Sequence, residues 1–426
     1  MPSVAFHTLG CKVNQYDAQA MLERFIAAGY DVRDFSQKAD VYVVNTCTVT
    51  GTGDKKSMNA VRRAQKLNPA AEVVIAGCLA QRDGEKLLDT GARLVIGTSR
   101  RGEVVELLEK AVREGKQIAA TQDVSKAPFE RLFISADEGH TRAVVKIQEG
   151  CDRFCTYCII PYVRGGIRSR APEDIHAEAE RLAGAGFQEL VLTGIHLTSY
   201  GRDLKDATLL NAVRACVVPG IRRLRLGSLE PVIATDGFAS ELSQIPEVCP
   251  QFHLALQSGS DEVLKRMRRR YTTQEFAASC DSLRRFFPGC ALTTDVITGF
   301  PGETEGEFAQ TLAFCEKIGF ARLHVFPYSA RAGTRAAQMP GQVPKALRES
   351  RARELIALGK STARAYAATL LGTVQPVLFE DMENGLPRGY TPQYMDVRAL
   401  GAEPGQILNV RLDELTEEGF NGTVLK

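Results

Sequence analysis

Three cysteines, Cys151, Cys155 and Cys158, constrain this chain more than any other feature of its sequence. The C-x3-C-x2-C run can bend as a loop around a small bound cluster. Cysteine thiolates are the usual ligands of iron–sulfur clusters, and a four-iron cluster commonly takes four of them. This run supplies three, so one iron would stay open for another ligand. Zinc is a weaker alternative, because structural zinc sites usually pair two C-x2-C motifs. Three unrelated buried thiols are the remaining alternative.

Length and composition indicate an ordinary globular protein. A chain of 426 residues can form two or three domains, and 44% hydrophobic and 24% charged residues are typical values. No apolar run is long enough to span a membrane, and the N-terminus lacks the basic start and apolar core of a signal peptide. We therefore expect a cytoplasmic protein without a membrane contact. Eleven cysteines in a reducing compartment favour metal or cluster ligation over disulfides.

A second set of three cysteines, Cys11, Cys47 and Cys78, lies in the first part of the chain. Each one directly follows a predicted strand, and the strands are Val4–Leu9, Val41–Thr46 and Glu72–Gly77. Helical stretches between them predict a parallel α/β sheet. Parallel strands end on one edge, where ligands of open α/β sheets bind, so the three thiols could meet at a second cluster. Cysteines after strands are also common as small packing residues, and the residues alone leave this alternative open.

From Arg142 a second series of strands and helices begins. Six strands are predicted: Ala143–Gln148, Glu189–Gly194, Arg223–Leu229, Phe252–Gln257, Leu292–Gly299 and Arg322–Tyr328. Six such units favour an open (βα)6 partial barrel over the closed eightfold one. The Cys151 loop follows the first strand. We therefore expect it at the mouth formed by the carboxyl ends of the strands, where the chemistry of α/β barrels collects.

The last segment changes to short strands after a long helix over residues 345–370. The predicted strands are Thr373–Phe379, Met395–Leu400, Gln406–Leu412 and Asn421–Leu425. A small β-barrel fits this pattern. The predicted domain organisation is an N-terminal α/β domain over residues 1–115, a linker with one short strand over 116–141, a central barrel over 142–370 and the small barrel over 371–426.

Charge is distributed unevenly along the chain. Residues 371–426 carry a net charge of −5, and the first 370 residues carry +7. The basic runs Lys265–Arg270 and Arg222–Arg225 could meet a phosphate backbone or could simply be solvated helix faces. In the acidic last segment, a local patch for RNA remains possible. It would combine two arginines with two tyrosines for stacking: Arg388, Arg398, Tyr390 and Tyr394.

The cysteine motifs resemble those of radical S-adenosylmethionine enzymes, in the methylthiotransferase branch. The run Gln148–Gly165 carries the Cys151, Cys155 and Cys158 motif of that family. Three stretches are similar to its N-terminal domain: Thr8–Gln15, Asn45–Thr50 and Ala76–Gln81. The last segment is similar to the TRAM module, an OB-like fold that binds RNA in this family. The resemblance covers essentially the whole chain.

The resemblance implies two [4Fe–4S] clusters and S-adenosyl-L-methionine as cofactors. Cys151, Cys155 and Cys158 would be the catalytic set, and the open iron of their cluster would bind S-adenosylmethionine for reductive cleavage to a carbon radical. The second set would hold an auxiliary cluster that carries or supplies sulfur: Cys11, Cys47 and Cys78.

Eight further residues are predicted to contact S-adenosylmethionine, most of them at the ends of predicted barrel strands. They are Tyr157, Thr193, Gly194, Ser228, Glu230, Gln257, Gly299 and Phe326. Glycine at a strand end permits close backbone approach, and polar side chains there can bond ribose or carboxylate. Taken singly, each of them is as well explained by a turn or by packing.

Four stretches are most similar to the branch that acts on threonylcarbamoyladenosine: Gly10–Gln15, Asn45–Thr50, Leu192–Leu197 and Arg270–Thr273. This resemblance implies methylthiolation at C2 of N6-threonylcarbamoyladenosine at position 37 of tRNA, with the anticodon stem-loop as partner. The sulfur donor and the electron donor stay unidentified. The alternatives are a methylthiotransferase for isopentenyladenosine tRNA or for a ribosomal-protein aspartate. A non-catalytic iron–sulfur RNA-binding protein is a more remote alternative. Asp152 and Gly166 depart from the family pattern without removing a ligand.

Overall fold

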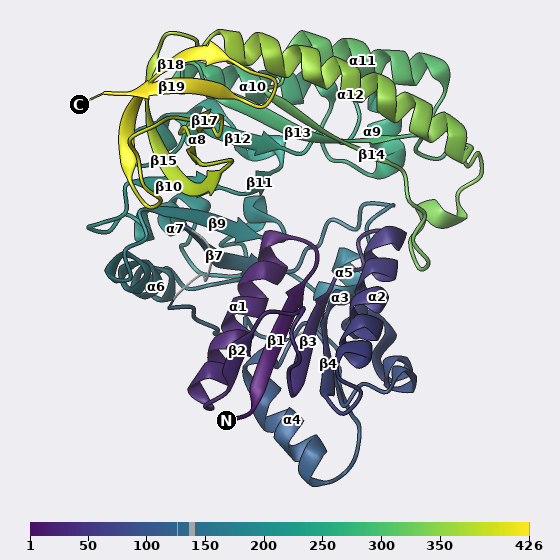
Figure 1. The fold of residues 1–426 in the computed structure, drawn as a ribbon. Coiled ribbons are helices and arrows are strands. Elements are labelled where there is room, and N and C mark those ends of the chain that lie inside the picture. Colours follow the sequence, from purple (N-terminus) through teal and green to yellow (C-terminus); the bar gives the residue numbers. More distant parts are fainter. Residues whose placement is uncertain (126, 136–140, 426) are drawn as a thin grey trace.

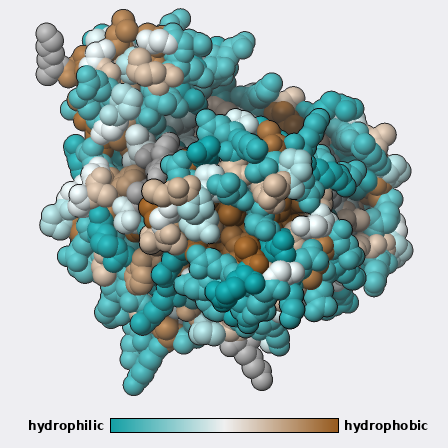
Figure 2. Space-filling view, turned by 60° about the horizontal axis from the view of Figure 1, so that its bottom comes forward, coloured by the Kyte–Doolittle hydropathy of each residue, from teal (hydrophilic) through white to brown (hydrophobic). Residues whose placement is uncertain are grey.

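The computed structural model describes residues 1–125, 127–135 and 141–425. Three parts follow one another along the chain: an N-terminal sheet, an open barrel and a small closed barrel (Figure 1). Within the described residues, no helix has both the length and the apolar character needed to cross a membrane. The face of the molecule in Figure 2 is mostly hydrophilic, with apolar side chains gathered near its centre.

The N-terminal sheet has six parallel strands in the order β2-β1-β3-β4-β5-β6. Their bounds are β1 Ser3–Thr8, β2 Asp31–Arg33, β3 Val41–Thr46, β4 Glu72–Gly77, β5 Leu94–Ile96 and β6 Ile118–Ala120. Four helices accompany them: α1 Lys12–Ala27, α2 Gly51–Leu67, α3 Cys78–Asp83 and α4 Val104–Arg113. Every residue of β3 is buried, because apolar clusters cover both faces of the sheet. The predicted parallel α/β sheet is confirmed, and β6 is a short strand within the stretch 116–141, where a linker with one short strand was predicted.

Two four-stranded sheets make the wall of the open barrel, in the orders β10-β9-β7-β8 and β11-β12-β13-β14. The first comprises β7 Arg142–Glu149, β8 Arg168–Ser169, β9 Glu189–Gly194 and β10 Arg223–Leu226. The second comprises β11 Ser228–Leu229, β12 Gln251–Leu254, β13 Ala291–Thr298 and β14 Arg322–Pro327. The predicted open (βα)6 arrangement is confirmed, with β8 as an additional antiparallel edge strand.

The predicted strand Arg223–Leu229 is divided between the two sheets, which corrects the sequence prediction. Its break falls at Gly227, whose N–H donates to the Leu192 carbonyl oxygen at 2.9 Å. A Cβ at Gly227 would lie 3.1 Å from the same oxygen, so the chain bends where only glycine fits comfortably. Leu229 then pairs with Leu254 of the second sheet.

Eight helices belong to the barrel region. They are α5 Ile160–Arg164, α6 Pro172–Gly184, α7 Leu209–Ala215, α8 Asp236–Ser243, α9 Asp261–Met267, α10 Thr273–Phe286, α11 Glu305–Ile318 and α12 Lys345–Ala368. Leu190 and Leu192 of β9 and Leu224 of β10 are fully buried in the apolar core that includes residues of α6 and α7. Because side chains alternate along a strand, the residues between these leucines face the inside of the barrel.

The C-terminal part is a closed barrel in the order β15-β16-β17-β19-β18. Its strands are β15 Val374–Glu383, β16 Leu386–Tyr390, β17 Asp396–Arg398, β18 Ile407–Leu415 and β19 Phe420–Val424. The predicted small barrel is confirmed, but β16 was missed because Pro387 and Gly389 break its strand pattern. Gly389 is needed, since a Cβ there would lie 2.3 Å from the Leu378 carbonyl oxygen.

The C-terminal barrel packs against the amino ends of the open barrel's strands through aromatic and cationic side chains. Tyr390 and Tyr394 stack at 4.7 Å between ring centroids. The guanidinium groups of Arg142 and Arg225 each lie 4.8 Å from the Tyr394 ring centroid, and Arg225 Nη1 donates to the Pro392 carbonyl oxygen at 2.9 Å. The two tyrosines considered for RNA stacking are therefore used in packing within the protein.

The two arginines of that patch are also occupied. Arg388 Nε lies 2.6 Å from the Asp396 carboxylate, and Arg398 pairs with Glu383 and Glu418. A hollow of about 770 Å³ is lined by residues of this barrel and of α12 and β14. The exposed cations on its α12 side are Lys360 and Arg364.

Candidate functional site

The Cys151 loop is held in a tight fold that begins at Gly150. Gly150 has φ +73°, and a Cβ there would lie 1.8 Å from the Gly166 carbonyl oxygen. Cys151 N–H donates to the Gly165 carbonyl oxygen at 3.0 Å, and Cys158 N–H donates to the Cys155 carbonyl oxygen at 2.9 Å. The loop therefore closes on the segment that follows α5, and its glycine is required by close backbone approach.

The three thiols of this loop lie close enough together to influence one another's protonation. Burial and, to a smaller extent, the neighbouring Cys155 raise the pKa of Cys158 to about 12. Burial likewise raises the pKa of Cys151 to about 11. Arg269 Nη1 donates to Cys155 Sγ at 3.3 Å. Buried thiols of this kind lose their protons when a metal centre binds, so ligation would be coupled to proton release.

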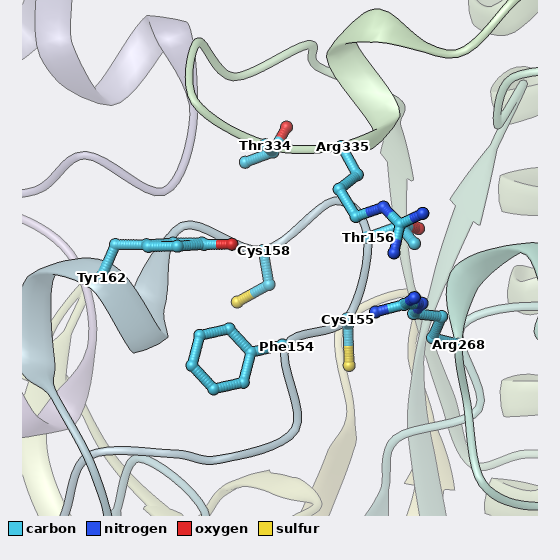
Figure 3. A pocket seen from close by; sticks show the side chains of 8 residues that line it. All are labelled: Phe154, Cys155, Thr156, Cys158, Tyr162, Arg268, Thr334 and Arg335. Carbon is cyan, nitrogen blue, oxygen red and sulfur yellow. The ribbon is translucent and has the colours of Figure 1, made fainter.

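A cavity of about 140 Å³ opens beside two of these thiols, Cys155 and Cys158 (Figure 3). Phe154 and Tyr162 border it on one side, and their rings pack edge to face at 5.5 Å between centroids. Its other lining residues are Thr156, Arg268, Thr334 and Arg335. The loop thus offers three soft donors together with space for a small bound group.

Gly150→Ala is expected to reduce the iron that this loop retains, because the added Cβ clashes with backbone and the residue needs a positive φ. After anaerobic reconstitution, we expect the variant to hold about four irons per chain and the wild type about eight. Gly184→Ala is the matched control, since a Cβ there meets nothing within 4 Å. A full iron content in Gly150→Ala would show that the loop tolerates the change.

The second set of thiols comes from three neighbouring strands of the N-terminal sheet. Cys11 caps α1 after β1, Cys47 follows β3, and Cys78 begins α3 after β4. Because β1, β3 and β4 are adjacent, their carboxyl ends bring the three thiols to one edge. Burial, together with Cys11 and Cys47, raises the pKa of Cys78 to about 11, while Arg164 opposes the rise. The thiols are therefore close enough to interact electrostatically.

The backbone around this set fits a bound cluster. Gly10 has φ +106°, and a Cβ there would lie 3.1 Å from Cys47 Sγ, so any side chain would crowd the thiol. Arg164 Nε donates to Cys78 Sγ at 3.2 Å. Three thiolates with a cationic donor are a soft set that suits iron–sulfur ligation. Among the described residues, no three His, Cys, Asp or Glu side chains converge closely enough to hold a single metal ion.

One short helix joins the two sets of thiols. α5 begins two residues after Cys158 and ends at Arg164, which contacts Cys78. Ile159 and Val163 pack against Cys78 in a small apolar cluster. A five-residue helix is about 8 Å long, so both sets lie at the same junction between the N-terminal sheet and the open barrel.

A buried ionic network lies at this junction. Lys146 Nζ is 2.5 Å from Asp17 and 3.1 Å from Glu149, and Arg164 Nη1 is 3.1 Å from Asp17 and 2.9 Å from Glu149. Arg101 also pairs with Asp17. Burial opposes ionisation of Asp17, but Arg101, Lys146 and Arg164 together hold its pKa below the usual value.

Glu230, one of the predicted cofactor contacts, joins two guanidinium groups and an imidazole around the Cys151 loop. Its carboxylate lies 2.8 Å from Arg153, 3.0 Å from Arg269 and 3.1 Å from His196. Burial raises the pKa of Glu230, but the His196 hydrogen bond and Arg269 outweigh this and lower it to about 2. Arg269 also donates to Cys155 Sγ, so Glu230 fixes the position of an arginine that contacts this thiol. Its contact with S-adenosylmethionine stays a prediction.

Glu230→Gln is expected to destabilise the protein in a pH-dependent way. The folded pKa lies below that of an unfolded glutamate, so the ionised carboxylate stabilises the fold above about pH 5. This stabilisation, on the order of 3 kcal/mol at pH 7, is lost as the pH falls toward 2. Thermal unfolding at pH 7 and at pH 4 measures it. Glu241→Gln, in an exposed pair with Arg214, should change little. An equal deficit at both pH values would contradict this account.

Three other predicted cofactor contacts lie near the loop or at the end of β9. Tyr157 packs edge to face with Phe300 at 6.5 Å between centroids. Thr193 is buried, and Gly194 follows it at the end of β9. A Cβ at Gly194 would lie 2.8 Å from Gln148 Cβ, so a close approach within the wall requires glycine there.

The remaining predicted contacts lie on or after strands of the second sheet of the open barrel. Ser228 and Phe326 are exposed on β11 and β14. Gln257 has φ +68°. Gly299 has φ +67°, and a Cβ there would lie 2.1 Å from Arg348 Cγ. Packing against α12 therefore already accounts for Gly299. For all of them, binding of S-adenosylmethionine stays a prediction.

Lys12 was not among the predicted site residues, although it directly follows Cys11. Its side chain is exposed. Desolvation near its ammonium group, together with Arg142 and Arg225, nevertheless lowers the pKa of Lys12 to about 8, while Glu189 opposes them. The only signal for it in the sequence is its position beside a ligand cysteine.

Comparison with known proteins agrees with this arrangement. The chain matches the model of the uncharacterized protein family UPF0004 over residues 3–97 and that of the radical SAM superfamily over residues 145–315. The solved radical S-adenosylmethionine methyltransferase TsrM from Kitasatospora setae, with cobalamin and a [4Fe-4S] cluster bound, has a TM-score of 0.56. It is 16% identical and covers 79% of this chain and 77% of its own, so it shows a shared fold.

Curated relatives match along nearly the whole chain. The threonylcarbamoyladenosine tRNA methylthiotransferase MtaB of Bacillus subtilis is 43% identical, covering 97% of this chain and 94% of its own length. The Thermotoga maritima protein of the same name is 34% identical, covering 98% and 96%. A tRNA-2-methylthio-N(6)-dimethylallyladenosine synthase of Moorella thermoacetica is 37% identical, covering 88% and 86%. The chain belongs to the radical S-adenosylmethionine methylthiotransferase family, in its threonylcarbamoyladenosine tRNA branch.

Proposed function

We propose that this protein transfers a methylthio group to C2 of N6-threonylcarbamoyladenosine at position 37 of tRNA. The observation that carries the proposal is the placement of two thiol triads at one domain junction, joined by α5. The relatives that bear this activity in their names match over nearly the whole chain and support the choice of nucleoside. The protein would act in the cytoplasm, where its tRNA substrate is found.

The residues of this chain have separable tasks in such a reaction. Bound clusters and S-adenosylmethionine supply the sulfur and the radical chemistry that an aromatic C–H bond requires, because no side chain is basic enough to deprotonate it. Cys151, Cys155 and Cys158 would hold one cluster and Cys11, Cys47 and Cys78 the other.

The residues around the thiols would tune and shield the clusters. Arg269 donates to Cys155 and Arg164 to Cys78, and hydrogen bonds to cluster sulfurs adjust the reduction potential. Phe154 and Tyr162 wall the cavity beside the Cys151 loop and would keep water from it.

The anticodon stem-loop would be the part of tRNA that is bound. The C-terminal barrel is acidic and uses Arg388 and Arg398 in internal pairs. Phosphate contacts would therefore come from exposed cations elsewhere, with Lys360 and Arg364 beside the large hollow as candidates.

The test is reconstitution under anaerobic conditions, followed by incubation with S-adenosylmethionine, sulfide, a reductant and an anticodon stem-loop that carries N6-threonylcarbamoyladenosine. Mass spectrometry of the nucleosides should show the 2-methylthio derivative. Parallel reactions with an isopentenyladenosine stem-loop and with a ribosomal-protein peptide separate the other methylthiotransferase activities. Product from one of these substrates alone would overturn the proposal. Absence of 5′-deoxyadenosine in every reaction would point to a non-catalytic RNA-binding protein.

A further inference from the structure

We propose that Lys12 determines substrate specificity by binding the carboxylate of the threonyl group on the target adenosine. This inference rests on the proposed function and goes beyond it by assigning a residue to the recognition of the nucleoside. It starts from the position of Lys12, which is exposed and directly follows the ligand cysteine Cys11.

The inner face of the open barrel carries a polar belt. Arg225 Nε donates to Glu189 at 2.8 Å, and its Nη1 donates to Gln251 at 3.2 Å. Gln251 Nε2 in turn donates to Thr293 Oγ1 at 3.3 Å, and the same hydroxyl lies 3.0 Å from His253 Nδ1. Neighbouring positions on these strands include buried leucines and Phe252 of the helix-facing core. The belt therefore faces inward and runs across four strands, from β9 to β13.

Lys12 begins α1, the helix of the N-terminal part that packs against the strands carrying this belt. α1 packs beside β7 and β9 (Figure 1). The ammonium group of Lys12 interacts electrostatically with Arg142, Arg225 and Glu189 at the amino ends of the barrel strands. Lys12 is thus placed between the auxiliary thiols and the barrel strands β7 and β9, where we expect a substrate that approaches those thiols to lie.

Lys12 is a cation without a bound anion. None of the hydrogen bonds or ion pairs among the described residues involves it, although Glu189 is nearby. Glu189 is already shared by Arg223 at 3.4 Å and Arg225 at 2.8 Å, and Arg142 pairs with Glu380 at 2.6 Å. The carboxylates of this region are therefore committed to arginines, and the lysine is left for an anionic ligand.

The chemistry of the substrate places its carboxylate near this lysine. C2 of the adenine would have to approach the cluster that Cys11, Cys47 and Cys78 would hold, since that cluster would supply the sulfur. N6 is attached to the carbon on the other side of ring nitrogen N1, so its substituent leaves the base on the edge that carries C2. A threonylcarbamoyl group on N6 ends in a carboxylate, whereas an isopentenyl group has no charge. Lys12, beside Cys11, is placed to distinguish the two.

The test measures binding of three anticodon stem-loops that differ only at N6: the threonylcarbamoyl acid, its methyl ester and the isopentenyl form. Fluorescence anisotropy with the reconstituted full-length protein at pH 7 gives the Kd of each. We expect the wild type to bind the acid about 10- to 100-fold more tightly than the ester, as a charge-assisted bond would allow. Lys12→Gln should bind the acid and the ester alike, and Lys12→Arg should keep most of the preference.

Two outcomes would overturn the inference. If Lys12→Gln weakened all three RNAs equally, the lysine would be a phosphate contact, and if it kept the preference for the acid, another group would read the carboxylate. Lys110→Gln, at an exposed lysine of α4, is the control for a general loss of charge. Iron content and melting temperature check that each variant is folded. Because binding is measured separately from turnover, a lack of methylthio product in the wild type would count against the proposed function and not against this inference.

Discussion

A variant in which Cys11, Cys47 and Cys78 are all replaced by alanine should bind about four irons per chain in place of about eight, and should form no methylthio product. It should still convert S-adenosylmethionine to 5′-deoxyadenosine when reduced. The reason is structural: these thiols lie on the edge of the N-terminal sheet, whereas Cys151, Cys155 and Cys158 lie in a separate loop of the open barrel. Iron and sulfide assays, chromatography of 5′-deoxyadenosine and mass spectrometry of the RNA measure the three quantities.

The reciprocal variant sharpens this test. Replacing Cys151, Cys155 and Cys158 should abolish both 5′-deoxyadenosine and product while about four irons remain at the other site. Cys290→Ala is a matched control, because Cys290 is a buried cysteine outside both sets and its replacement should leave about eight irons. If either triple variant lost all of its iron, or none of it, the division of the six thiols into two independent sites would be wrong.

The parts of the fold that could be predicted are those whose burial is complete. β3 and β4 were predicted with their observed bounds, because parallel strands covered on both faces give unbroken apolar runs. β2 was missed, since all three of its residues, Asp31–Arg33, are exposed and carry no apolar pattern. Short edge strands depend on pairing with a neighbour, which the local sequence does not report.

The basic runs show a second limit. Arg223 and Arg225 were considered as a phosphate-binding or solvated run, but both are buried on the inner side of β10. Their partners are Glu189 and the carbonyl groups of Pro376, Tyr390 and Pro392 in the C-terminal barrel. These partners are distant in sequence, so only the tertiary fold reveals why arginine is found there.

Some residues of the candidate site could likewise be predicted from the sequence, and others could not. The six cysteines could be proposed from sequence because cluster ligation demands one residue type at defined positions. The donation of Arg164 to Cys78 and of Arg269 to Cys155 could not, because it depends on tertiary contacts between residues that are distant in sequence. Lys12 is intermediate: its neighbour Cys11 was predicted, but its place beside the barrel strands depends on how α1 packs against the barrel.

Arg164→Met should destabilise the protein by about 3–5 kcal/mol, because it leaves the buried carboxylates of Asp17 and Glu149 short of a partner. Methionine fills a comparable volume, so the lost charge rather than a cavity causes the deficit. Calorimetry should show a lower melting temperature for the transition of the N-terminal part. Arg33→Met, in an exposed pair with Asp31, is the control and should change little.

The electrostatic origin of this deficit can be tested by removing one of the carboxylates. In an Arg164→Met background, Asp17→Asn should recover part of the lost stability, although Asp17→Asn alone destabilises the wild type, because Lys146 and Arg101 then lose their anion. The deficit of Arg164→Met should also shrink as the pH falls from 7 toward 4, since protonation relieves the unpaired carboxylates. Strictly additive effects of the two substitutions, with no change in the deficit with pH, would mean that Arg164 acts through packing alone. In that case its contact with Cys78 would be its remaining role at the junction.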